Sequence, residues 1–220
     1  MLKSEAAWLG AQLSALPVEA LSPLLNIGSG PRRLREEVQP YIEELVFQPQ
    51  LRRGVTVVHS DINAGPGIDV AGDIFDDKHL TRLAAVSARA LICSNMHEHV
   101  RDPAALTRRY MSLLPAGGYA AVTVPYSFPY HRDPIDSLFR PDLASLRALH
   151  EGTEVVAQEC VVDKTYADEV HERPLRLLAD LVRLPRVIRD TGGLAYWRPF
   201  WLRRHYLVSC LMVRKEGPPG

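Results

Sequence analysis

Short apolar runs that alternate with helical segments are the feature that most constrains this chain. An apolar run of four to eight residues is typical of a buried strand, and a helix between two such runs is typical of a parallel crossover. The runs lie at residues 24–27, 55–59, 68–70, 90–94, 119–124, 154–162 and 206–213. Helical patterns lie at residues 4–16, 77–88, 102–114, 142–150 and 172–190, the last interrupted near Pro185. The sequence therefore predicts an α/β fold with a doubly wound, mostly parallel sheet.

Composition narrows the class of protein further. Hydrophobic residues make up 46% of the 220 residues and charged residues 24%, which is the balance of a globular protein. The formal net charge is zero, so we expect no nucleic-acid partner. Cys93, Cys160 and Cys210 are too far apart to suggest a disulfide framework or a zinc knuckle. The chain shows neither a signal-peptide pattern nor an apolar membrane span, and we expect a cytoplasmic protein.

The chain is predicted to form a single domain over residues 1–220. Its core covers about residues 22–165, and a helical cap with the last strand covers about 166–215. Residues 171–220 hold ten Lys and Arg against four Asp and Glu, so this part is basic and the rest is acidic. Opposite charges of this kind indicate either an acidic partner or attraction between the two parts.

A glycine turn separates the first strand from the helix that follows it. Gly28 and Gly30 allow the backbone to turn tightly and to approach a ligand, and the helix N-terminus attracts negative charge. A nicotinamide-binding turn would need a third glycine where Arg33 stands, and an acid about 20 residues on. Asp61 lies 33 residues after Gly28, which weakens that interpretation. An ordinary strand–helix turn is the simpler alternative.

Two carboxylates follow neighbouring strands at the same expected sheet edge. Asp61 follows the second strand at its carboxyl end, where its carboxylate can accept both hydroxyls of a ribose. Asp73 follows the third apolar run, where it can accept the amino group of an adenine. Capping of a turn or helix is the alternative role for each residue.

These spaced elements, with "LICSNMHEHVRDP" and "LLPAGGYAAVTVP", resemble the class I S-adenosylmethionine-dependent methyltransferases over about residues 22–145. The longer string "PYSFPYHRDPIDSLFRP" resembles a sub-family of small bacterial methyltransferases associated with glycan and cell-surface pathways. The chain departs from the family pattern at Asn26, where an acid is usual, and at Arg32, where the third glycine is usual. The resemblance implies a seven-stranded Rossmann-like sheet whose last strand is antiparallel.

The resemblance also implies a site for S-adenosyl-L-methionine as cofactor. The amino-acid part of the cofactor would lie against the glycine turn, the ribose against Asp61, the adenine against Asp73 and Ile74, and the sulfonium near Asn95. The cofactor-binding residues implied are Asn26, Gly28, Ser29, Gly30, Asp61, Ile62, Asp73, Ile74 and Asn95.

Two loops that follow the fourth and fifth strands carry the candidate catalytic residues. Methyl transfer to a hydroxyl needs alignment of the reactants and a general base, and an imidazole with a pKa of about 6.5 suits that task. The titratable side chains that cluster in the two loops are His97, Glu98, His99, His131, Asp133 and Asp136. The catalytic candidates are His131, Asp133 and His99, with His131 as the preferred base and Asp133 or Asp136 orienting it. Packing or loop-bracing roles are the alternatives. No compact ligand spacing stands out, so the sequence predicts no metal site.

The segment at residues 196–204 interleaves aromatic and basic side chains. It can cover the sheet, contact the acceptor or dock at a membrane surface. The activity that these inferences favour is O-methylation of a glycan or small-molecule acceptor by direct displacement, with S-adenosylhomocysteine as the second product. The rival interpretations are a non-catalytic S-adenosylmethionine-binding partner protein and a nicotinamide-dependent oxidoreductase.

Overall fold

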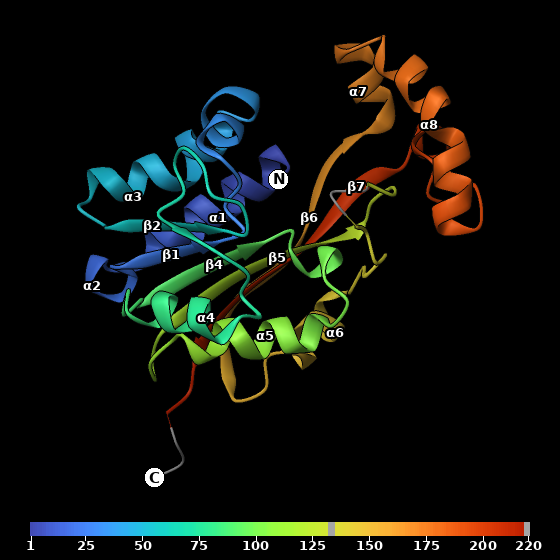
Figure 1. Cartoon of the computed structure of the whole chain (residues 1–220). Helices are drawn as coiled ribbons and strands as arrows, with labels where there is room; N and C mark the ends of the chain where they lie inside the picture. The colour runs from blue at the N-terminus through green and yellow to red at the C-terminus, as the bar shows by residue number, and fades with distance from the viewer. Residues whose placement is uncertain (132–134, 218–220) are drawn as a thin grey trace.

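The computed structural model describes residues 1–131 and 135–217, and it contains a seven-stranded sheet in the order β3-β2-β1-β4-β5-β7-β6 (Figure 1). The strands are β1 Leu24–Ile27, β2 Val57–Asp61, β3 Val70–Ala71, β4 Ala90–Ser94, β5 Tyr119–Ser127, β6 Thr153–Thr165 and β7 His205–Lys215. Strands β3, β2, β1, β4 and β5 are parallel, whereas β7 is antiparallel to both β5 and β6. The predicted doubly wound sheet with an antiparallel last strand is therefore confirmed.

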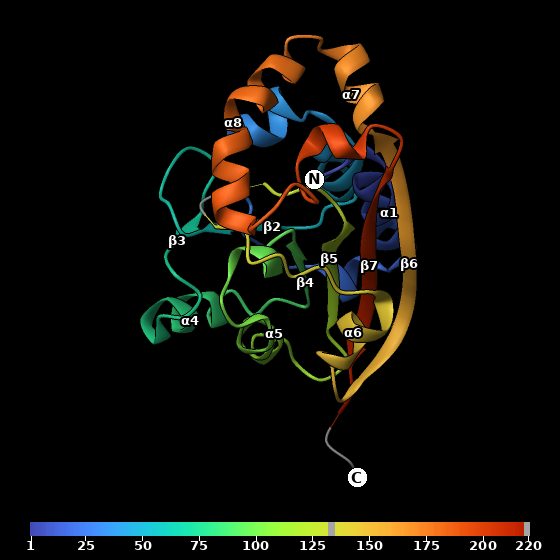
Figure 2. The ribbon, with the colours of Figure 1, turned by 90° about the vertical axis from the view of Figure 1, so that its right-hand side faces the viewer.

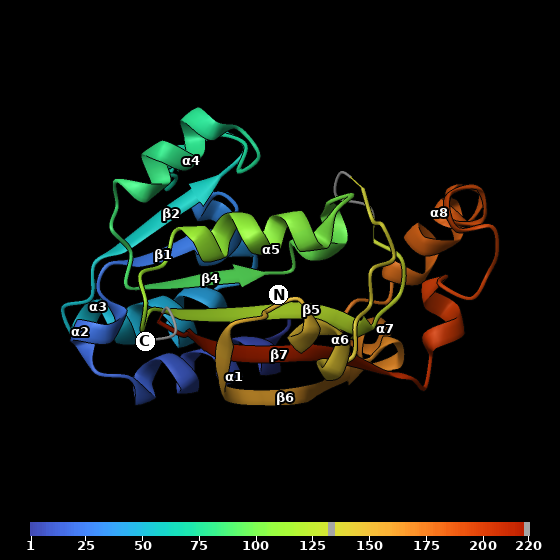
Figure 3. The ribbon, with the colours of Figure 1, turned by 90° about the horizontal axis from the view of Figure 1, so that it is seen from below.

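Helices cover both faces of the sheet, as the view in Figure 3 shows. The α-helices are α1 Lys3–Ala15, α2 Val18–Leu21, α3 Gln48–Arg52, α4 Asp77–Ala84, α5 Pro103–Ser112, α6 Leu143–Ala148, α7 Tyr166–Glu172 and α8 Arg176–Thr191. Shorter π- and 3₁₀-helical turns are η1 Leu34–Val38, η2 Glu43–Phe47, η3 His97–His99 and η4 Arg198–Trp201. The sheet thus lies between two helical layers. The loops that follow the carboxyl ends of the parallel strands lie at the edge where open α/β sheets bind their ligands.

Alternation along each strand divides the core between the two faces. Ile92 of β4 packs with Leu9 of α1 and Phe47 of η2 on one face. Leu91, its neighbour along the strand, packs with Leu106 and Tyr110 of α5 on the other. All six side chains are almost completely buried. Because successive strand residues point to opposite faces, the continuous apolar run of β4 is what a two-sided core requires.

The segment between β6 and β7 forms a helical cap beyond the arrowheads of β5 and β6 (Figures 1 and 2). A small aromatic cluster of Tyr166, Trp201 and Tyr206 joins the cap to the strands. This placement puts α7, α8 and η4 at the sheet edge where the candidate loops lie.

The structure differs from the predicted elements in several places, among them residues 166–172, which form α7 ahead of the helix predicted at 172–190. Residues 43–52, for which the sequence analysis assigned no element, form η2 and α3. Helix α8 continues through Pro185, where an interruption was expected. A proline removes one backbone hydrogen bond, and the other hydrogen bonds of this 16-residue helix keep it continuous. Within the described part of the chain, no helix combines the length and apolar character needed to cross a membrane.

Candidate functional site

The glycine turn after β1 has the backbone geometry that the sequence predicts. Gly28 has a φ of 67° and Gly30 a φ of 61°, values that side-chain-bearing residues rarely adopt. A Cβ on Gly28 would collide with the thioether of Met96, which follows β4. The backbone N–H of Ser29 donates to the carbonyl of Ser60 at 3.0 Å, which ties the turn to the end of β2.

Asp61 closes this turn from the neighbouring strand. Its Oδ2 accepts the backbone N–H of Gly30 at 2.9 Å, and its Oδ1 accepts the N–H of Asn63 at 3.1 Å. Each carboxylate oxygen has a further lone pair, so the group can still accept two ligand hydroxyls. The partly exposed Asp61 therefore lies beside the glycine turn, as expected from the order of the strands.

A buried arginine that the sequence analysis did not single out supports the turn from behind. Arg35, whose side chain is almost fully buried, donates to the carbonyl of Gly30 at 2.6 Å and to that of Gly67 at 3.0 Å. Burial lowers the pKa of Arg35, although nearby Glu43 acts in the opposite direction. Arg32 instead extends outward beside Glu36, so the residue at the family's third glycine position does not crowd the turn.

The loops after β2 and β3 hold the residues predicted to contact adenine. Asp73 is exposed, and its Oδ1 accepts the N–H of Phe75 at 2.9 Å. Ile74 is buried in the core below, whereas 64% of Ile62 is exposed next to Asp61. An exposed isoleucine in this loop offers an apolar surface to a flat ligand.

Asn26 lies at the end of β1, but its amide is engaged with the neighbouring strand. Its Nδ2 lies 3.1 Å from Nδ1 of His59. Burial, followed by the charge of Arg35, lowers the pKa of His59 to about 4. The amide can therefore donate to an unprotonated ring nitrogen, which fixes both side chains at the edge of the site.

Asn95 follows β4 with a φ of 51°, and its side chain binds a residue that sequence reasoning missed. Glu5 of α1, which is completely buried, accepts the Asn95 amide at 2.8 Å and the Thr123 hydroxyl at 2.5 Å. The other oxygen of Glu5 accepts the backbone N–H of Leu2 at 2.8 Å. A carboxylate from α1 thus joins the end of β4 to the middle of β5, and the early position of Glu5 in the sequence gave no signal of this.

The two predicted catalytic histidines lie together, and Glu98 lies between them. The rings of His99 and His131 are 5.1 Å apart in an edge-to-face arrangement. The Nε2 atom of each ring is 3.7 Å from Oε1 of Glu98, whose side chain is fully buried. The expectation that the two loops meet at one edge is confirmed for these residues, and Glu98, another candidate of the first loop, lies with them.

Asp136 is placed to orient His131. Its Oδ2 accepts the backbone N–H of His131 at 3.0 Å and lies 3.4 Å from the ring Nδ1. Arg140 donates to both Asp136 oxygens, at 2.7 and 3.0 Å. Burial acts to raise the pKa of Asp136, but the hydrogen bonds and charge of Arg140 hold it below its usual value. Asp133, the other predicted catalytic acid, lies outside the described residues.

Backbone hydrogen bonds connect the same two loops. Ser137 donates its backbone N–H to the carbonyl of Glu98 at 2.8 Å and its hydroxyl to the same carbonyl at 3.0 Å. Nδ1 of His99 lies 2.5 Å from the carbonyl oxygen of Ile135. Because a carbonyl only accepts, this ring carries its proton on Nδ1 and in its neutral form has a lone pair on Nε2.

The basic aromatic segment at 196–204 is only partly available to a partner. Trp201 is buried, and Arg198 forms an ion pair with Glu169 at 2.9 Å and lies over the ring of Phe128. In contrast, 62% of Phe200 is exposed. Much of this segment therefore packs the cap against the sheet.

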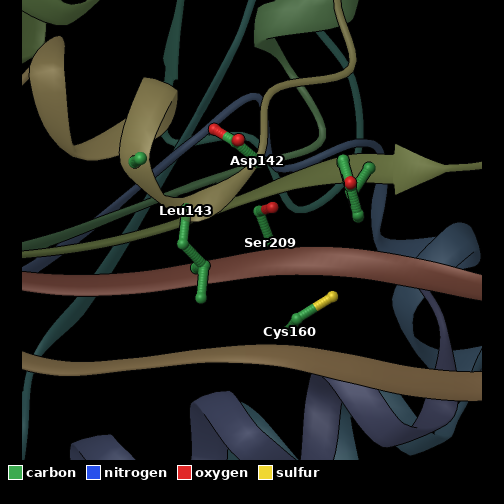
Figure 4. A pocket seen from close by; sticks show the side chains of 6 residues that line it. Asp142, Leu143, Cys160 and Ser209 are labelled. Atoms are coloured by element: carbon green, nitrogen blue, oxygen red, sulfur yellow. The ribbon is translucent and has the colours of Figure 1, made fainter.

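A separate open pocket of about 260 Å³ lies between α6 and the antiparallel strands (Figure 4). It is lined by Tyr126, Asp142, Leu143, Ala144, Cys160 and Ser209. None of the predicted cofactor or catalytic residues lines it, so we do not assign it to the candidate site.

Comparisons with known proteins show the fold of the chain. No protein-family model and no curated protein matches the sequence. The structure of coclaurine N-methyltransferase bound to N-methylheliamine and S-adenosylhomocysteine matches with a TM-score of 0.54 and 16% identity, over 96% of this chain and 70% of that one. An S-adenosylmethionine-dependent methyltransferase from Archaeoglobus fulgidus matches with a TM-score of 0.52 and 16% identity, over 96% and 92%. Because the sequence identities are only 16%, the likeness concerns the fold: the chain has the Rossmann-like methyltransferase fold.

Proposed function

We propose that this chain is an S-adenosylmethionine-dependent methyltransferase that methylates an oxygen of a glycan or another small hydroxylated molecule. The observation that carries the proposal is the turn at Gly28–Gly30, which Asp61 closes at the carboxyl edge of the sheet. Both solved structures with this fold that are described above carry methyltransferase names, which supports the same assignment.

The residues at this edge fit the cofactor. Gly28 and Gly30 give the turn its positive φ values, and Asp61 has acceptor capacity for ribose hydroxyls. Ile62 offers an apolar surface, and the adjustable Met96 side chain lies over the turn. Asn26 and Asn95 complete the proposed set with Ser29, Asp73 and Ile74, although both amides also bind neighbouring side chains.

When bound, S-adenosylmethionine supplies a methyl group that its sulfonium already activates for displacement. The protein then has to align an acceptor with that methyl group and help remove the acceptor's proton. His131 and His99, with Glu98 between them, form a group that can perform this second task. Asp136 orients His131. The catalytic role of Asp133 stays a prediction.

The experiment is incubation of the protein with S-adenosylmethionine and a panel of glycans and small hydroxylated metabolites. We expect formation of S-adenosylhomocysteine that depends on one acceptor class, with the product shown by mass spectrometry to be methylated on oxygen. Binding of S-adenosylhomocysteine with no transfer to any acceptor would favour a non-catalytic partner protein. Methylation on nitrogen would contradict the O-methylation part of the proposal. Membrane contact through residues 196–204 stays a separate prediction.

A further inference from the structure

Glu98 presents a buried carboxylate that accepts no hydrogen bond from the described residues. Its side chain has no exposed surface, and within the described residues neither Oε1 nor Oε2 has a hydrogen-bond donor. A buried carboxylate that lacks donors is costly unless a positive charge or a proton compensates it. The groups around Glu98 therefore indicate whether a proton or a cation compensates its charge.

Two imidazole nitrogens face this carboxylate. The Nε2 atoms of His99 and His131 each lie 3.7 Å from Oε1 of Glu98, and the three ligand atoms lie within 4.8 Å of one another. Hydrogen-bonded N···O pairs are about 2.7–3.2 Å apart, so a proton does not bridge either pair. Ligand atoms about 2.1 Å from a shared tetrahedral ion lie about 3.4 Å apart. A small inward movement of the side chains would thus place one cation between them.

The far side of the His99 ring has the partner that a metal-binding histidine needs. Metal-bound histidines usually donate their second ring N–H to a backbone carbonyl or a carboxylate, which fixes the tautomer. Nδ1 of His99 donates to the carbonyl of Ile135, and Nδ1 of His131 lies 3.4 Å from Asp136. The His99 contact directs the Nε2 lone pair of that ring toward Glu98. For His131, the 3.4 Å separation is longer than a hydrogen bond, and Asp136 is a carboxylate near its Nδ1 that binding of an ion could bring into contact.

We propose that Glu98, His99 and His131 bind one divalent transition-metal ion. Two imidazoles and one carboxylate are a ligand set typical of zinc and of other first-row ions with open coordination positions. The side chains of His99 and His131 are 20% and 24% exposed, so an ion can reach the site from solvent. The sequence analysis predicted no metal site because His131 is 32 positions from His99, and only the fold brings the two loops together.

The role of the ion rests on the proposed methyl transfer. At this edge of the sheet, an open coordination position would orient and polarise the acceptor oxygen. His131 would then act as a metal ligand in place of the general base that the sequence suggests. Metal removal should stop methyl transfer while leaving the affinity for S-adenosylhomocysteine unchanged.

The test measures metal binding without cofactor or acceptor. Chelator-treated protein is titrated with Zn²⁺ by calorimetry and with Co²⁺ by visible absorption, for the wild type and for Glu98→Gln, His99→Gln and His131→Gln. His171→Gln, which changes an exposed histidine of α7, is the matched control. We expect one ion per chain in the wild type and the control, and at least about hundredfold weaker binding in each ligand variant.

Two results would overturn the proposal. One is the absence of Zn²⁺ and Co²⁺ binding by the folded wild type, and the other is wild-type affinity in folded His99→Gln or His131→Gln. These two variants change partly exposed side chains, so they keep the test decisive if Glu98→Gln fails to fold. Loss of S-adenosylhomocysteine binding with intact metal binding would contradict the proposed function but not the metal site.

Discussion

The carboxylate of Asp61 holds the backbone N–H of Gly30 at 2.9 Å, which joins the end of β2 to the turn that follows β1. Arg35 binds the carbonyl of the same glycine at 2.6 Å from the other side. The turn is therefore fixed at both polar groups of Gly30 before any ligand binds. This preorganisation reduces the ordering cost of binding.

Replacement of Asp61 should weaken binding of S-adenosylhomocysteine. Asp61→Ala removes charge-assisted hydrogen bonds to ribose of about 1.5–3 kcal/mol, so we expect roughly ten- to hundredfold weaker affinity by calorimetry. Glu154→Ala, an exposed carboxylate on β6, is the control and should bind normally. Unchanged affinity in folded Asp61→Ala would remove this residue from the site.

Gly28→Val should abolish cofactor binding while the helical content is largely retained. A side chain at this φ costs about 1–2 kcal/mol, and its Cβ would displace the Met96 side chain that lies over the turn. Gly54→Val is a matched control because Gly54 has a φ of 86° and open space around its Cβ position. Circular dichroism and calorimetry should show comparable folding but binding only in the control. Full binding by Gly28→Val would mean that the turn is merely a connector.

Glu5→Ala should destabilise the protein by about 2–4 kcal/mol in denaturant unfolding. The substitution leaves the Asn95 amide and the buried Thr123 hydroxyl without their shared acceptor. Lys3→Ala, an exposed position on the same helix, should change the free energy of unfolding by less than about 0.5 kcal/mol. Equal stability of the two variants would show that Glu5 does not hold α1 to the sheet.

His131→Gln should lower the turnover rate by roughly 10²–10⁴-fold with the true acceptor. The affinity for S-adenosylhomocysteine should change little, because His131 lies with Glu98 and His99 and not with the glycine turn. His171→Gln serves again as the control. Near-normal turnover by His131→Gln would assign this histidine to bracing of its loop.

The protein should lose stability as the pH falls below about 6.5. Burial lowers the pKa of folded His59 to about 4, so the unfolded chain binds a proton there first. Above about pH 6.5 His59 is neutral in both states and does not change the free energy of unfolding. At pH 5 its protonation in the unfolded chain lowers the free energy of unfolding by about 2 kcal/mol. His59→Gln should reduce the loss between pH 7.5 and 5 by that amount in urea unfolding. An identical loss in both proteins would show that His59 takes up its proton without unfolding.

Sequence patterns predicted the features that depend on strand order. The apolar runs located β1, β4 and β5, and parallel strand ends explain why His99 and His131 meet. Glu5 and Arg35 were not predicted to have the roles they have. Each is a charged residue that is buried by contacts with distant segments, such as the contact of Glu5 with Thr123. Local periodicity carries no information about such distant contacts.

The most direct test of the central claim is calorimetric titration of the wild-type protein with S-adenosylhomocysteine and, separately, with NAD. The Gly28–Gly30 turn and Asp61 predict saturable binding of S-adenosylhomocysteine and no measurable binding of NAD. Binding of NAD without binding of S-adenosylhomocysteine would contradict the assignment and favour an oxidoreductase. Binding of neither ligand would show that this edge of the sheet does not hold a nucleoside cofactor.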